Sequence, residues 1–206
     1  MQKRLANLIS YVFHPLLMAT GLVTILYFFA PSVIQPISPE SIVPILLMVF
    51  ILTYIIPLIS IGMLKITSSI SSLKLSNRKE RLMPFFFVTI YYGLTAYLFA
   101  NKVVLGRTLI IVFFAITAII FVVAVVTIFY KISAHSAGAW GVVGFMIGLY
   151  FKYPDSYLYY PIIGAIVLAG IINSSRLLLN EHSLTEIFWG SLLGVSVSFG
   201  SIYLLT

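Results

Sequence analysis

The chain has 206 residues, of which 61% are hydrophobic and 8% charged, and its formal net charge at pH 7 is +7. Its mean hydropathy is +1.13. A soluble domain usually carries about 25% charged residues, so this composition excludes a water-soluble globular protein, and it equally excludes disorder, collagen and a coiled coil. The chain has no cysteine, which excludes disulfides, thiolate zinc sites and cysteine nucleophiles. The composition therefore predicts an all-α polytopic membrane protein.

Apolar runs that could cross a membrane recur along the whole chain. A transmembrane helix needs about 20 apolar residues, and the sequence offers seven segments: Leu8–Ala30, Ile42–Leu64, Pro84–Ala100, Thr108–Tyr130, Ala137–Phe151, Tyr159–Ile172 and Ile187–Leu205. The third, fifth and sixth are short, so a bundle of six helices stays open beside one of seven. The first run lacks a small-residue cleavage site, so we expect a span and not a signal peptide. Only connectors remain, such as 31–41 and 152–156, and we expect one transmembrane domain over residues 1–206.

Positive charge is distributed unevenly between the connections. With seven spans, the N-terminus and the loops after spans two, four and six lie on one side of the membrane, opposite the C-terminus. That side carries nine lysines and arginines, against three on the other side. The positive-inside rule places the richer side in the cytoplasm. These few cations belong to membrane loops, so they do not indicate a nucleic-acid partner.

The scarce ionisable residues gather at the membrane ends of spans on that one side. They include Lys74, Arg81, His135, Arg176, His182 and Glu186. Ionisable groups at such positions are costly and usually mark function, although each cation taken singly could be an interface anchor. Arginine forks match phosphate oxygens, Ser133 adds a hydroxyl, and the amides that open the following helix favour an anion. Two histidines could supply a nucleophile and an acid for a leaving oxygen.

His182 and Glu186 are four residues apart, which on a helix places them on one face. The carboxylate would then orient the imidazole. The segment from Ser183 to Glu186 also has the pattern of a capping box, and if Ser183 is the cap, His182 lies just outside the helix. The chain has only five acidic residues, and a magnesium site normally needs several carboxylates. We therefore expect metal-independent chemistry without a cofactor.

The three polar clusters resemble the signature of the type 2 phosphatidic acid phosphatase family, membrane phosphatases related to the vanadium haloperoxidases. Its first block is a lysine, six residues and arginine-proline. Its middle block is proline-serine-glycine-histidine, and its last is serine-arginine, five residues, histidine, three residues and aspartate. The matching blocks here are residues 74–84, 133–136 and 175–186. The chain departs from the signature at Leu82, Ile132, Ala134 and Glu186, which replace two prolines, a glycine and the aspartate.

The resemblance implies a role for each matched residue. His182 would attack phosphorus to form a phosphohistidine, Glu186 would support it, and His135 would protonate the leaving alcohol. The phosphate-binding positions would be Lys74, Arg81, Ser133, Ala134 and Arg176. The implied activity is a hydrolase of lipid metabolism, a phosphatase for the phosphomonoester or diphosphate of a membrane lipid. The implied location is a bacterial inner (plasma) membrane, with the site on the outer face, which conflicts with the charge count.

Several alternatives stay open from the sequence. The substrate could be phosphatidate, phosphatidylglycerol phosphate, a polyprenyl phosphate or diphosphate, or a lipid A phosphate, and the oligomeric state is undetermined. A non-enzymatic protein that binds or moves an anionic lipid, and a lipid phosphotransferase, are the competing functions. The His14-Pro15 pair inside the first span is interpreted as a kinked helix with a satisfied histidine, in preference to a proton relay or a headgroup site.

Overall fold

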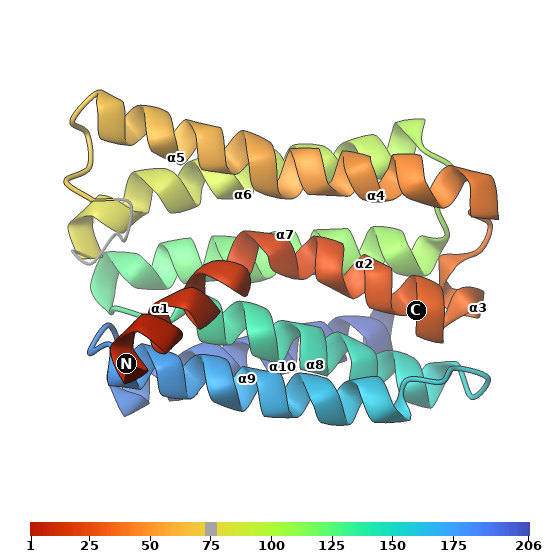
Figure 1. Ribbon diagram of the computed structural model, residues 1–206. Coiled ribbons are helices and arrows are strands. Elements are labelled where there is room, and N and C mark those ends of the chain that lie inside the picture. The colour runs from red at the N-terminus through yellow and green to blue at the C-terminus, as the bar shows by residue number, and fades with distance from the viewer. Residues whose placement is uncertain (73–77) are drawn as a thin grey trace.

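The computed structural model describes residues 1–72 and 78–206, and the regular secondary structure of these residues is entirely helical. Seven helical stretches in them are long and apolar enough to cross a membrane: Gln2–Phe29, Pro39–Ile66, Arg78–Lys102, Arg107–Phe129, Ala134–Lys152, Tyr159–Leu178 and Leu184–Leu205. The stretches run side by side, and the two chain ends lie at opposite ends of the bundle (Figure 1). The prediction of an all-α bundle of six to seven membrane helices is confirmed.

Three of the spans consist of several elements. The first span contains α1 (Gln2–Val12), η1 (Pro15–Leu17) and α2 (Met18–Phe29). The second span contains η2 (Pro39–Ser41), α4 (Ile42–Phe50), η3 (Ile51–Ile55) and α5 (Ile56–Ile66). The third span contains η4 (Arg78–Arg81) and α6 (Leu82–Lys102). The last four spans are the single helices α7 (Arg107–Phe129), α8 (Ala134–Lys152), α9 (Tyr159–Leu178) and α10 (Leu184–Leu205).

The structure corrects two sequence predictions, the lengths of three spans and the nature of one connector. The third, fifth and sixth spans are longer than predicted from the sequence, because polar residues at their ends continue the helix beyond the apolar run. Thus α9 continues past Ile172 as far as Leu178 and includes Arg176. The segment 31–41 is also more than a plain connector, since it holds the short helix α3 (Pro31–Ile34) and η2. The extra turns carry much of the polar sequence discussed below.

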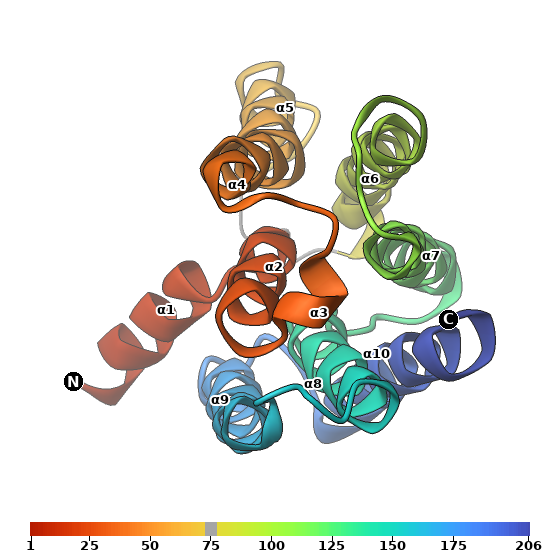
Figure 2. The same ribbon diagram turned by 90° about the vertical axis from the view of Figure 1, so that its right-hand side faces the viewer.

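The first span is broken at His14-Pro15. The helix α1 ends at Val12, and His14 has extended backbone angles, φ −66° and ψ 139°. Proline lacks a backbone N–H and disfavours the helical region for the residue before it, so the break falls where the sequence predicts a kink. Figure 2 shows α1 leaving the axis of α2 and pointing away from the bundle, and α1 packs against α9.

The second span contains one turn of π-helix, η3, directly before Pro57. A π-turn inside an α-helix commonly marks a functional position, and the missing N–H of Pro57 removes one regular helical hydrogen bond here. The turn buries Thr53, whose hydroxyl donates to Val49 O at 2.7 Å. It also directs Tyr54 toward the break in the first span, with its ring edge-on to His14 at a centroid distance of 6.3 Å.

The helices α8 and α10 pack closely through glycines. A Cβ atom on Gly190 would lie 2.6 Å from Ser133 O, and one on Gly194 would overlap Ala137 O. Small residues allow this close backbone approach in membrane helices. The contact brings the start of α8 against the start of α10, where Ser133 N donates to Glu186 O at 3.3 Å. Two of the sequence blocks are thereby fixed relative to each other.

The polar end of the bundle is defined by the N-terminus, the residues just before α6, and the connections 130–133 and 179–183 (left in Figure 1). All three sequence blocks reach this end. The predicted residue Lys74 lies outside the described residues.

Candidate active site

A cavity of about 290 Å³ begins at the polar end and continues into the bundle. The charged and imidazole-bearing residues that line it are Arg81, His135, Arg176, Glu181, His182 and His14. Beyond them the lining is mostly apolar and comes from η1, α2, α5, α6, α7 and α8. The fold therefore brings Arg81 of the first block, His135 of the middle block, and Arg176 and His182 of the last block to the wall of one cavity.

His182 and Glu186 form a short polar contact in the site. Nδ1 of His182 lies 2.6 Å from Oε2 of Glu186. The carboxylate can only accept, so Nδ1 carries the proton in this geometry and the lone pair of a neutral ring is on Nε2. Nε2 is then the nitrogen available for attack on an electrophile.

The local sequence explains how a residue outside the helix meets one inside it. Ser183 is the N-cap of α10, and its Oγ accepts from Glu186 N at 3.3 Å. The Glu186 side chain reaches His182, the residue immediately before the cap. Glu186 therefore takes part in the cap through its backbone and orients the imidazole through its side chain.

The surroundings of His182 lower its pKa. Burial is the largest cause, and the cations Arg81 and Arg176 act in the same direction, so that the pKa falls from 6.5 to about 2. The adjacent carboxylate favours the imidazolium and opposes this shift, but the ring is buried, with 7% of the residue exposed. The ring is accordingly neutral near pH 7, which is the nucleophilic form.

Arg81 and Arg176 place two buried positive charges beside this ring. Only 4% and 8% of their surfaces are exposed. Arg81 Nη1 donates to Ile132 O at 3.3 Å, and Arg176 Nη1 donates to Ser10 Oγ at 3.3 Å. Arg176 Nη2 lies 3.9 Å from a carboxylate oxygen of Glu181. Arg176 Nε is buried and has no hydrogen-bond partner among the described residues, so this guanidinium retains a donor for an anion.

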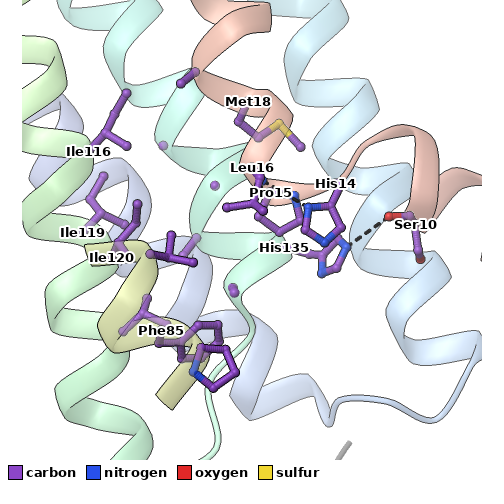
Figure 3. Close-up of a pocket in the computed structure, with 18 of the residues that line it drawn as sticks. Ser10, His14, Pro15, Leu16, Met18, Phe85, Ile116, Ile119, Ile120 and His135 are labelled. Atoms are coloured by element: carbon purple, nitrogen blue, oxygen red, sulfur yellow. Dashed lines mark hydrogen bonds between the residues drawn. The ribbon is translucent and has the colours of Figure 1, made fainter. Parts of the chain in front are cut away.

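His135 lies at the start of α8 and contacts the first span. Its Nε2 is 3.2 Å from Ser10 O (dashed in Figure 3). Because a carbonyl can only accept, Nε2 carries a proton, and Nδ1 is the nitrogen that could exchange a proton with a ligand. The ring of His14 meets that of His135 edge-on at a centroid distance of 5.8 Å, and Figure 3 shows the two rings side by side.

The remaining residues of the middle block have different positions. Ala134 lines the cavity. Ser133 is fully buried, and its Oγ accepts from Ser136 N at 3.3 Å and from Ser136 Oγ at 2.8 Å as the N-cap of α8. Among the described residues, the Ser133 side chain is therefore engaged in capping and is not part of the cavity wall.

Among the lining residues that the sequence analysis missed, His14 and Ser10 contact His135. His14 was interpreted as structural; its Nδ1 does accept from Leu16 N at 3.3 Å, yet the ring also lines the cavity. Ser10 received no role, although it contacts both Arg176 and His135. A signal for Ser10 existed, because Asn7, Ser10 and Tyr11 have the spacing of one helical face, and all three line the cavity.

Within residues 1–72 and 78–206, no group of three or more His, Asp or Glu side chains is placed to hold a metal ion. Comparisons with protein-family models, curated proteins and solved structures give no match to this chain.

Proposed function

We propose that the protein is an integral membrane phosphatase that hydrolyses the phosphomonoester or diphosphate of a lipid through a phosphohistidine at His182. The observation that carries the proposal is the His182 ring, oriented by Glu186, in a cavity that also contains two buried arginines. A nucleophile held by a carboxylate and flanked by fixed cations is the arrangement that attack on a phosphate requires.

In the first step, Nε2 of His182 attacks phosphorus, and the bond from phosphorus to the lipid oxygen breaks. The leaving oxygen takes a proton from His135, which must be protonated on Nδ1 at that moment because Nε2–H is engaged with Ser10 O. Glu186 stabilises the positive charge that develops on the His182 ring. Arg81 and Arg176 stabilise the charge on the phosphoryl oxygens.

In the second step, water attacks the phosphorus of the phosphohistidine. His135, now neutral, accepts a proton from this water, and the bond between Nε2 of His182 and phosphorus breaks. Phosphate leaves, and both histidines return to their starting protonation states. The cycle uses groups of this chain and water, and it requires neither a metal nor a cofactor.

A lipid is the favoured substrate because the cavity has a charged end and an apolar remainder within a membrane bundle. A phosphate on a hydrocarbon anchor matches both parts. The resemblance in sequence adds a bacterial inner membrane as the proposed location. Phosphatidate, phosphatidylglycerol phosphate, polyprenyl phosphates and lipid A phosphates are the candidates to be tested.

The test is phosphate release by detergent-purified protein from a panel of these lipids. His182→Ala is compared with Arg107→Ala, whose residue is exposed at the first position of α7 and does not line the cavity. We expect release by the parent and by Arg107→Ala, none by His182→Ala, inhibition by vanadate and no effect of EDTA. Absence of release from every lipid by folded protein would contradict the proposal and favour a binding or transport protein. Transfer to an alcohol in place of water would indicate a phosphotransferase.

A further inference from the structure

The shape of the cavity suggests which part of a lipid it holds. Along α8 the lining runs from Ala134 to Phe145, a rise of about 16 Å at ~1.5 Å per residue. Along α7 it runs from Val123 back to Ile116, in the same direction away from the polar end. A volume of about 290 Å³ spread over that length makes the cavity long and narrow.

The two ends of the cavity have opposite chemistry. Arg81, Arg176 and His182 lie at the polar end, while Leu22, Ile116 and Phe145 line the deep part. Figure 3 shows Ile116 projecting from α7 above the level of His14 and His135, with Ile119 and Ile120 about level with the two rings. A ligand that matches this gradient has an anionic head and an apolar tail.

We propose that this cavity binds the hydrocarbon tail of the substrate, and that the substrate is a single-chain lipid phosphate whose tail lies inside the bundle. The inference rests on the proposed function for the identity of the head. A two-chain lipid fits poorly, because a second chain beside the first would have to displace packed side chains of α2, α7 or α8. Because the apolar lining extends over this depth, we expect hydrolysis to depend on the length of the tail.

The first experiment locates the tail without requiring turnover. His182→Ala protein is incubated with dodecyl phosphate that carries a diazirine at the far end of the chain, then irradiated, and the labelled residues are identified by mass spectrometry. We expect labelling on the deep wall, near Leu22, Ile116 or Phe145, which excess dodecyl phosphate suppresses. Labelling confined to lipid-facing residues such as Ile90, which is 41% exposed, would overturn the proposal.

The second experiment uses opposite substitutions at one lining position. Ile116→Phe fills the cavity, and Ile116→Ala lengthens it; Ile90→Phe is the matched control on the lipid-facing surface of α6. With a series of n-alkyl phosphates in mixed micelles, Ile116→Phe is expected to lower kcat/KM roughly tenfold for the longest chains and to spare the shortest. Ile116→Ala is expected to shift the preferred length upward. Equal effects on all chain lengths would contradict a tail site, since general structural damage gives no opposite shifts.

The third experiment compares the hydrolysis of phosphatidate, which has two chains, with that of the single-chain alkyl phosphates. Its kcat/KM is expected to be roughly tenfold or more below that of the alkyl phosphates, and equal values would overturn the single-chain inference. The two proposals fail separately. Deep labelling without phosphate release would contradict the enzymatic function and support the tail site. Phosphate release together with labelling of lipid-facing residues would support the enzymatic function and contradict the tail site.

Discussion

Nδ1 of His182 lies 2.6 Å from Oε2 of Glu186, although the histidine precedes the cap of α10 and the glutamate lies inside the helix. The contact fixes which ring nitrogen carries the proton. It also places a negative charge where the ring becomes positive during attack on phosphorus. The proposed nucleophile therefore depends on this contact for both its tautomer and its charge stabilisation.

Replacing Glu186 by glutamine is therefore expected to lower kcat and to leave KM nearly unchanged. Glutamine keeps an acceptor for Nδ1–H but removes the charge, and a hydrogen bond to a charged group contributes about 1.5–3 kcal/mol. The loss in kcat should be roughly 10- to 100-fold. Steady-state phosphate release measures it, and Glu40→Gln, at an exposed glutamate, is the control. A variant with full kcat would remove Glu186 from the mechanism.

Arg176→Ala is expected to weaken stabilisation of the phosphoryl oxygens. The guanidinium is buried and has an unpartnered Nε among the described residues, and loss of one such donor typically costs about 10²–10³-fold in kcat. The inhibition constant of vanadate should rise in parallel, because the anion mimics phosphate. Arg107→Ala should behave like the parent in both assays. Unchanged vanadate inhibition in Arg176→Ala would show that the anion binds elsewhere.

Acid is expected to destabilise the protein partly through His182. Its pKa is lowered from 6.5 to about 2 on folding, so the unfolded state binds the proton more readily between these values. The contribution of His182 to stability is complete above about pH 6.5 and is lost as the pH falls toward 2. The thermal midpoint of His182→Gln should therefore depend less on pH than that of the parent. Identical slopes below pH 6.5 would contradict a neutral buried ring.

Gly194→Ala is expected to lower both the thermal midpoint and the activity. The new methyl group would overlap Ala137 O and separate α8 from α10, at a cost of about 1–3 kcal/mol. Gly200→Ala is the matched control on the same helix, because nothing lies within 4 Å of its Cβ position. Circular dichroism melts and phosphate release measure the two effects. Equal melting of the two variants would contradict close glycine packing as the fixed support of the site.

Much of the fold could be predicted because membrane spans have a strong local signal. The seven apolar runs and the break at His14-Pro15 depend on composition and on proline alone. The span ends were less predictable, because polar residues such as Arg176 continue a helix that the apolar pattern does not mark.

The site was predictable where it depends on short spacing. The four-residue interval from His182 to Glu186 is one case, and their contact is present in the structure. The contacts of Ser10 and His14 with His135 were not predictable, because more than one hundred residues of sequence separate them. The spacing of Asn7, Ser10 and Tyr11 marks a helical face but does not show what that face contacts. Only the packing of α1 on α9 and the break before α2 bring Ser10 and His14 into the cavity. A sequence also leaves open whether the Ser133 hydroxyl caps a helix or faces a ligand.

Trapping of the covalent intermediate tests whether His182 is the nucleophile. The protein is mixed with a ³²P-labelled lipid phosphate that it hydrolyses, quenched in alkali within one turnover and digested for mass spectrometry. We expect an alkali-stable, acid-labile phosphoryl group on His182 that is absent from His182→Ala. Phosphate release without any labelled histidine, or with the label on His135 or His14, would contradict it.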